Sequence, residues 1–238
     1  MERKKTIGIT GAGGTLGKAL TKKFKQKGHY VIGFTHDKNN KIIDNLSPDE
    51  WVFWECNQET LLEKHLEKID ILILNHGIYS QNNNSIDYEK SISINALSKF
   101  RILCLFEKTL EKIKYLNSPK EVWINTSEAE IMPALNPSYE ISKLLIGQLI
   151  TFKKNSLNSD KREKLRIRKI IIGPFKSNLN PIGILSPEIV VEQIFLIAHL
   201  NFSLIIVSPN PISYIVFPLR ELYFIFYCKL LSMLKKLN

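Results

Sequence analysis

Apolar and polar positions follow two periods that alternate along the chain. Short β-branched runs predict buried strands, and between them apolar residues recur at helical spacing. Alternating strands and helices predict βαβ units, and therefore a parallel sheet covered by helices on both faces. We expect an α/β, Rossmann-type doubly wound sheet of about seven strands. The predicted strands are 5–10, 29–35, 51–55, 69–74, 121–126, 166–173 and 203–207, and the predicted helices are 15–27, 58–68, 87–116, 137–154 and 187–200.

Polar segments interrupt this pattern in three places. Residues 80–85 and 155–162 are expected to be surface loops. Residues 174–187 form a connection rich in proline and asparagine after a strand, a position from which such segments often cover a ligand crevice. There is no internal repeat and no linker, so we predict one NAD(P)-binding domain over residues 1–208 and an extension over residues 209–238.

A glycine-rich turn joins the first predicted strand to the first predicted helix. Its sequence, TGAGGTLG, has the spacing GxxGxxG. Glycine permits the tight bend, the close approach of backbone to a pyrophosphate and the close packing of helix on strand, and the helix N-terminus then faces the phosphates. The residues expected to bind a dinucleotide here are Thr10, Gly11, Gly13, Gly14, Thr15, Leu16 and Gly17.

The end of the second predicted strand should contact the adenosine ribose. An acidic residue at that point would accept a hydrogen bond from the 2′-hydroxyl and favour NAD. The chain instead has Thr35 and His36 there, with Lys38 close behind, and their side chains can bind a 2′-phosphate. This pattern favours NADP(H) over NAD(H). Asp37 supports the alternative, NAD(H), and a third interpretation is that these are turn residues only.

Tyr139 and Lys143 lie four residues apart, and therefore on one face of the predicted helix 137–154. Pairs with this spacing are common and mean little alone. The interpretation of this pair as catalytic is strengthened by Ser127, at the end of an upstream strand, and by Asn95 on the preceding helix.

With these residues assembled, the chain resembles a short-chain dehydrogenase/reductase over roughly residues 5–208. The matching segments follow the family order: TGAGGTLG at 10–17, LNHG at 74–77, Asn95, Ser127, YEISK at 139–143 and IGPF at 172–175. The resemblance adds Asn75, Gly77 and Pro174 to the expected cofactor contacts, together with Tyr139 and Lys143.

The resemblance implies hydride transfer between a carbonyl and a hydroxyl group. Tyr139 would donate its phenolic proton in reduction, or accept the hydroxyl proton in oxidation. Lys143 would stabilise the phenolate and bond the nicotinamide ribose, Ser127 would hold the substrate oxygen, and Asn95 would order a water of the proton relay. Ser127 lies one residue closer to Tyr139 than is common in the family, which leaves Thr126 as a substitute.

Composition and charge limit the partners. Apolar residues make up 44% of the chain, enough for a sizeable core. The formal net charge is +10, but the lysines are spread, and the dense run at 161–169 is expected to be a solvated loop leading into a strand. We therefore expect no nucleic-acid binding. The cysteines and the scattered histidines have no metal-ligand spacing, so no metal is expected, and neither a disulfide framework nor a signal-peptide segment is evident, which predicts a cytoplasmic location.

An apolar and aromatic segment, residues 209–238, follows the last predicted strand. Pro218, Arg220 and Glu221 interrupt it, so a full membrane span is the least favoured interpretation. A helix that caps the substrate pocket or a subunit face is one interpretation, and a basic aromatic helix lying on a membrane is the other. The second would associate the protein with membranes and suits a lipid-like substrate. The chain also resembles sequences named sterol desaturase/short-chain dehydrogenase.

The primary hypothesis is an NAD(P)(H)-dependent oxidoreductase acting on a small-molecule carbonyl or alcohol. The family resemblance also implies a homo-oligomer. The second is a nucleotide-binding regulatory or scaffolding protein at a membrane surface, without turnover. Epimerisation of a nucleotide sugar is disfavoured, because residues 174–187 are too few for a substrate domain.

Overall fold

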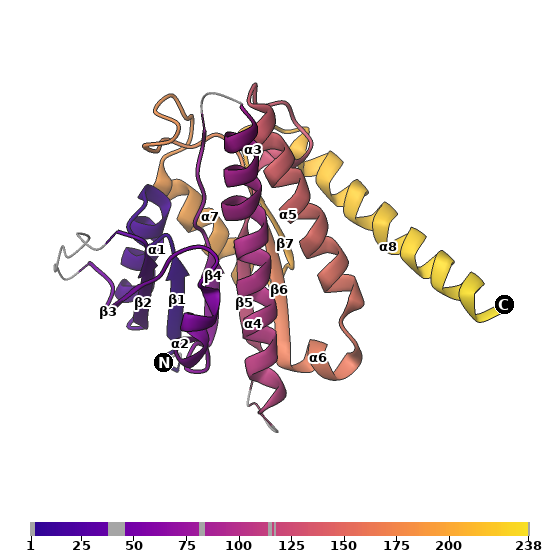
Figure 1. Ribbon diagram of the computed structural model, residues 1–238, viewed down its shortest axis with the longest axis horizontal. Coiled ribbons are helices and arrows are strands. Elements are labelled where there is room, and N and C mark those ends of the chain that lie inside the picture. Colours follow the sequence, from indigo (N-terminus) through magenta and orange to yellow (C-terminus); the bar gives the residue numbers. More distant parts are fainter. Residues whose placement is uncertain (1–2, 38–45, 81–83, 114–115, 117, 238) are drawn as a thin grey trace.

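The computed structural model describes residues 3–37, 46–80, 84–113, 116 and 118–237, with side chains described as far as residue 230. Its centre is a seven-stranded sheet in the order β3-β2-β1-β4-β5-β6-β7, in which every neighbouring pair is parallel (Figure 1). The order reverses between β1 and β4, as in doubly wound sheets, so the predicted fold class is confirmed. The strands are β1 (Thr6–Thr10), β2 (Tyr30–Thr35), β3 (Glu50–Phe53), β4 (Ile71–Leu74), β5 (Lys120–Asn125), β6 (Leu165–Ile172) and β7 (Leu204–Val207).

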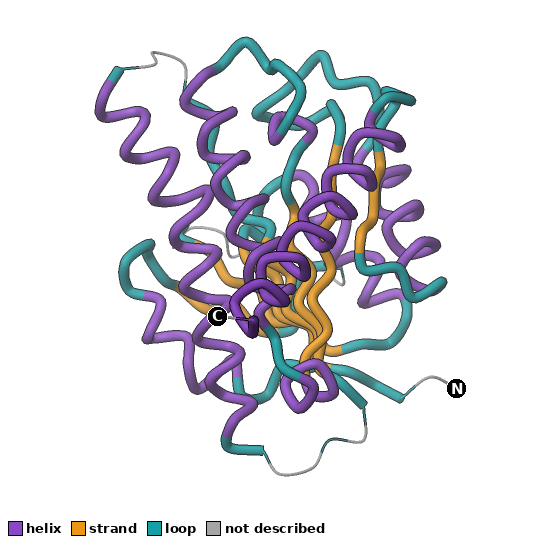
Figure 2. Tube along the Cα trace, turned by 90° about the vertical axis from the view of Figure 1, so that its right-hand side faces the viewer, coloured by secondary structure: helices purple, strands orange, loops and turns teal. Residues whose placement is uncertain are grey.

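Helices cover both faces of the sheet (Figure 2). On one face α1 (Thr15–Gln26) packs against α7 (Pro187–His199), around a core that includes Phe24 and Ile194. On the other face lie α2 (Glu63–Leu66), α4 (Lys99–Glu111) and α5 (Pro137–Ser156). The further helical segments are η1 (Glu59–Leu62), α3 (Ser85–Ser91), the π-helical η2 (Ile92–Ser98), η3 (Glu128–Glu130), α6 (Ser159–Lys164) and α8 (Ser213–Leu237).

The loop expected at 155–162 is only partly a loop, because α6 begins at Ser159. The side chain of Asn158 accepts a hydrogen bond from the backbone N–H of Lys161 and so caps the first turn. Asp160 in that turn and basic residues in the last turn suit the helix dipole. A six-residue helix with no buried side chain has no apolar period, which is why the pattern did not predict it.

The charged run 161–169 was also expected to be solvated, and for its second half this was wrong. Arg168 and Lys169 lie in β6 and are buried. Arg168 pairs with Glu121 on β5, with 2.7 Å between Nε and Oε2. Partners on other elements therefore allow these charges to lie inside the fold.

The extension forms one helix, α8, which continues through Pro218. The proline lies in the second turn, where its missing N–H removes one backbone hydrogen bond without ending the helix. Phe217 on this helix packs with Ile171 of β6 and Ile206 of β7. Within the part of the chain that the structure describes, no helix combines the length and the apolar character that crossing a bilayer requires.

Candidate functional site

A cavity of about 730 Å³ opens at the carboxyl ends of the central strands. Asn75 after β4, Asn125 at the end of β5 and Ile172 at the end of β6 line it. Its outer wall includes Pro174 and neighbouring residues of the segment 174–187, as expected for a crevice cover. Ligands of doubly wound sheets bind at this edge, beside the point where the strand order reverses.

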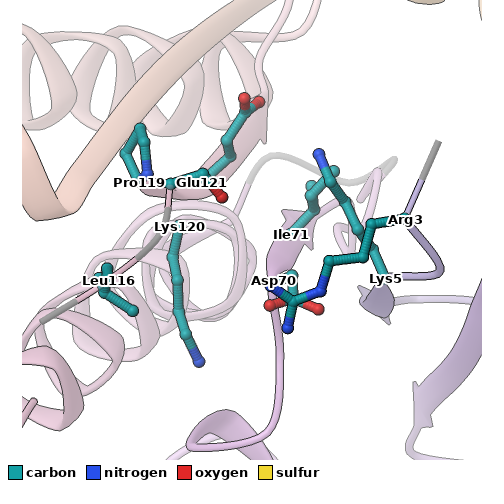
Figure 3. Close-up of a pocket in the computed structure, with 9 residues that line it drawn as sticks. Arg3, Lys5, Asp70, Ile71, Leu116, Pro119, Lys120 and Glu121 are labelled. Atoms are coloured by element: carbon teal, nitrogen blue, oxygen red, sulfur yellow. The ribbon is translucent and has the colours of Figure 1, made fainter.

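A smaller pocket of about 240 Å³ lies at the opposite edge, around the amino ends of β1, β4 and β5 (Figure 3). Lys5, Asp70 and Lys120 line it, and the Asp70 carboxylate accepts a hydrogen bond of 2.8 Å from the backbone N–H of Thr6. Because this edge is remote from the glycine-rich turn, the larger cavity is the candidate active site.

The glycine-rich turn has the geometry that a dinucleotide needs. Gly11 has a φ of +65°, and a Cβ there would lie 2.9 Å from the Cα of His76. A Cβ on Gly17 would lie 2.2 Å from the Gly11 carbonyl oxygen, so both positions require glycine. Gly14 is the N-cap of α1 and has no side chain to cap the helix, so the first N–H groups of α1 remain available to bind a phosphate. These residues fit the pyrophosphate of a nicotinamide dinucleotide.

The segment after β4 is tied to this turn through Thr10. The Thr10 hydroxyl accepts a hydrogen bond of 2.9 Å from the Asn75 backbone N–H and lies 2.8 Å from Nδ1 of His76. Burial, with the positive charges of Lys99 and Lys143, lowers the pKa of His76 well below its usual value. His76 is therefore neutral at physiological pH and acts as a structural link between β1 and β4.

α5 places Tyr139 and Lys143 together in the cavity wall. Asn136 caps the helix, since its side chain accepts a hydrogen bond of 2.9 Å from the Tyr139 backbone N–H, and Pro137 occupies the first turn. The Lys143 ammonium lies 5.1 Å from the centre of the Tyr139 ring. The ring of Tyr79 lies 5.4 Å from the same ring, on the side of the segment that follows β4.

Asn95 lies in the π-helical segment η2, a form that occurs frequently at functional sites. Its amide oxygen accepts a hydrogen bond of 2.7 Å from the Ile78 N–H, and its amide nitrogen donates to the Ile78 carbonyl and to the Ser142 hydroxyl, each at 3.0 Å. A Cβ on Gly77 would lie 2.9 Å from Asn95 Oδ1 and 3.8 Å from Lys143 Nζ. Asn95 therefore joins the segment after β4 to α5, beside the lysine.

The structure distinguishes between Thr126 and Ser127, the two candidates at the end of β5 for the hydroxyl that would hold the substrate oxygen. The Thr126 hydroxyl donates to the Ile170 carbonyl oxygen at 3.1 Å, and the residue is buried. Ser127 is the N-cap of η3, where its hydroxyl accepts a hydrogen bond of 3.2 Å from the Ala129 N–H. Both residues line the cavity, but the Ser127 hydroxyl can still donate to a substrate oxygen. This geometry favours Ser127.

The end of β2 is described only in part. Thr35 is buried, and its hydroxyl accepts a hydrogen bond of 3.1 Å from the Asp37 N–H, so it stabilises the turn. His36 and Asp37 are exposed. Lys38, the third residue expected to contact the cofactor here, lies outside the described residues.

Lys99, the first residue of α4, is a cavity residue that the sequence analysis missed. It is buried, and its Nζ donates a hydrogen bond of 2.8 Å to the Asn125 carbonyl oxygen. Burial, with the positive charge of Lys143, holds the pKa of Lys99 well below its usual value. The available signal was its position four residues after Asn95, but a lysine in an amphipathic helix normally faces solvent.

The lowered pKa of Lys99 makes stability depend on pH. Between the pKa values of the folded and unfolded states, the unfolded chain binds more protons, so stability rises with pH. Relative to Lys99→Met, the wild-type free energy of unfolding should fall by up to about 1.4 kcal/mol for each pH unit below about 10, until the folded pKa is reached. Urea unfolding of both proteins at about pH 9.5 and about pH 7.5 measures this, and a constant difference would contradict it.

Comparisons with known proteins place these features in a family. The model of the NAD dependent epimerase/dehydratase family matches residues 7–153. A monoglucosyldiacylglycerol epimerase from Synechocystis sp. is 36% identical over 223 residues, which cover 92% of this chain and 53% of that protein. The chain thus spans about half the length of this relative.

Solved structures share the fold at low sequence identity. A ketone-specific alcohol dehydrogenase from Comamonas testosteroni is 15% identical with a TM-score of 0.75, covering 92% of each chain. A short-chain dehydrogenase from Sphingobium yanoikuyae, in complex with NADPH, is 15% identical with a TM-score of 0.72, covering 87% of this chain and 88% of that one.

The family match spans the glycine-rich turn, Asn95, Tyr139 and Lys143, and the family description implies a nicotinamide cofactor. The sequence resemblance to short-chain dehydrogenases/reductases is confirmed by this match and by the shared fold. The chain belongs to the NAD-dependent epimerase/dehydratase family, within the short-chain dehydrogenases/reductases.

Proposed function

We propose that this protein epimerises a hydroxyl-bearing carbon in the sugar group of a glycolipid, by transient hydride transfer to a nicotinamide dinucleotide. The observation that carries the proposal is the Tyr139–Lys143 pair in the wall of the 730 Å³ cavity. The glycolipid substrate is inferred from the relative that acts as a monoglucosyldiacylglycerol epimerase.

The glycine-rich turn, with Asn75, Gly77 and Lys143, would hold the nicotinamide dinucleotide, which would supply reversible hydride transfer at the carbinol carbon. Tyr139 would take the hydroxyl proton during oxidation and return it during reduction, so that protons and electrons balance over the cycle. Lys143 would stabilise the phenolate, and Ser127 would hold the substrate oxygen. Asn95 would position Lys143 through its bonds to Ile78 and Ser142.

A second candidate is a net dehydrogenase or reductase acting on a hydrophobic carbonyl. The apolar part of the cavity wall favours it, since Leu135, Phe175 and Leu179 lie there. Epimerisation of a nucleotide sugar has less support, because the segment 174–187 forms a short cover and the relative is named for a lipid-linked sugar.

An assay with monoglucosyldiacylglycerol in detergent micelles distinguishes the epimerase from the net dehydrogenase or reductase. Epimerisation changes the configuration of the released sugar, measured by chromatography, without a net change in reduced-nicotinamide absorbance. A dehydrogenase changes the absorbance instead. Cofactor binding without either change, over a panel of glycolipids and ketones, would refute both functions and favour a nucleotide-binding protein without turnover.

We infer that the cofactor is NADP(H) rather than NAD(H). Positions 35 and 36, at the end of β2, carry no carboxylate to accept a bond from the ribose 2′-hydroxyl, and exposed His36 can bind a 2′-phosphate. The same assay should therefore run faster with NADP⁺ than with NAD⁺ at equal concentration. A faster reaction with NAD⁺ would assign the adenosine contact to Asp37 instead.

A further inference from the structure

α8 differs from an ordinary surface helix because charged side chains bond on its inner face, beside Phe217, while its outer face is apolar. Ser213, Phe217 and Glu221 face inward and are buried. The charged pair in the middle of the helix also bonds inward: Arg220 lies 3.3 Å from Glu130, and Glu221 lies 2.9 Å from Lys169. In a helix at a protein–water boundary, charges normally occupy the outer face.

The outer face carries a continuous apolar stripe, made of residues three or four apart in sequence and therefore aligned along one side of the helix. We call this set the outer stripe, and none of its members is charged. Four of the five are more than half exposed. The outer stripe consists of Ile215 (62%), Leu219 (58%), Leu222 (62%), Phe226 (68%) and Leu230 (42%).

Tyrosines border the outer stripe. Tyr223 and Tyr227 are exposed and stack with 6.0 Å between their ring centres. A tyrosine ring has an apolar body and a polar tip, so it is enriched where an apolar layer meets water. The border of the outer stripe therefore resembles an interfacial anchor more than a site for a fully buried contact.

Buried polar contacts fix the first half of α8 beside the cavity. Ser208 and Ser213 both donate hydrogen bonds to the carboxylate of Glu128, a cavity residue that directly follows Ser127. From there α8 diverges from α5 toward its carboxyl end and extends away from the body of the protein (Figure 1). The direction of the outer stripe is thus fixed relative to the cavity.

We propose that the outer stripe docks on the surface of an anionic lipid bilayer. The tyrosine border matches the chemistry of a bilayer interface, and the formal net charge of +10 favours anionic lipid head groups. The inference rests on the proposed function only in that a glycolipid substrate would be met at such a surface. A second copy of this chain is the competing occupant.

Vesicle binding by the full chain tests this, without cofactor or turnover. The test variant is Leu219→Ser/Leu222→Ser/Phe226→Ser. The matched control is Leu196→Ser/Leu200→Ser/Phe202→Ser, which also removes two leucines and one phenylalanine, from positions on and after α7 that are 66%, 61% and 56% exposed. Sedimentation with phosphatidylcholine vesicles, with and without about 30% phosphatidylglycerol, gives the partition coefficient of each protein.

The wild type should bind the anionic vesicles more tightly than the neutral ones. The test variant should bind at least about tenfold more weakly, and the control within about twofold of wild type. A tryptophan at position 226 (Phe226→Trp) should be quenched by brominated lipids, which keeps the test decisive if the triple variant fails to fold. No vesicle binding by the wild type, or equal losses in test and control variants, would overturn the proposal.

Light scattering identifies the competing occupant. If the wild type is a dimer, the test variant is a monomer and neither binds vesicles, the outer stripe is a contact with a second copy, and the proposal of bilayer docking is overturned. Failure of the micelle assay with vesicle binding intact would instead remove the proposed function and leave the docking surface standing.

Discussion

Replacing Tyr139 with phenylalanine is expected to lower turnover about 10³-fold while leaving cofactor affinity almost unchanged. The substitution removes only the hydroxyl, so the reacting oxygen loses its proton acceptor in oxidation and its donor in reduction. The ring stays beside the Lys143 ammonium and the Tyr79 ring, at 5.1 Å and 5.4 Å in the wild type. The geometry of the cavity wall should therefore persist.

Single-turnover rates and calorimetric cofactor titrations of the same preparation measure the two quantities separately. Tyr30→Phe is the matched control, because it makes the same chemical change at the start of β2, at the sheet edge opposite the cavity. Its turnover should stay within about threefold of wild type. If Tyr139→Phe retained more than about a tenth of wild-type turnover, another group would have to transfer the proton.

The sheet could be predicted from local pattern because parallel strands are buried on both faces. β4 (Ile71–Leu74) has four consecutive buried apolar residues, and a run of this kind bounded by polar residues is typical of such strands. The glycine-rich turn could be predicted for a related reason. Gly11 and Gly17 are required by contacts with their immediate surroundings, so the requirement shows directly in the sequence.

The rest of the site depends on contacts between distant segments. The Tyr139–Lys143 pair follows from helical spacing, but the partners of Asn95 are Ile78 and Ser142, on two other elements. Lys99 has the sequence environment of a solvent-facing lysine and is buried only because the end of β5 supplies a carbonyl oxygen. No local pattern contains this information, since the fold itself brings these groups together.

The same limit applies to the buried charges that hold α8. The sequence predicts that Lys169 belongs to a solvated run, yet its ammonium lies 2.7 Å from Glu130 and 2.9 Å from Glu221. Thr151 donates a hydrogen bond of 2.7 Å to Glu221 as well. A Cβ on Gly147 would lie 1.9 Å from the Glu130 carboxylate, so this glycine leaves the space that the carboxylate occupies. The cluster thus joins η3, α5, β6 and α8.

Lys169→Met should lower the free energy of unfolding by about 3–5 kcal/mol, because it keeps the length of the side chain but leaves two buried carboxylates without their shared cation. The deficit should depend on pH. Burial already raises the pKa of Glu130 against the opposing charges of Lys169 and Arg220. Without Lys169 the carboxyl would protonate more readily, so the deficit should shrink as the pH falls from about 7 to about 5.

Urea unfolding at both pH values measures this deficit, with Lys112→Met as the control. Lys112 also pairs with two glutamates, Glu63 and Glu67, each at 3.2 Å, but in an exposed position where solvent screens the interaction. The control should therefore change stability little at either pH. A Lys169→Met deficit as small as that of the control would mean that apolar packing of Phe217, and not the buried charges, holds α8 against the sheet.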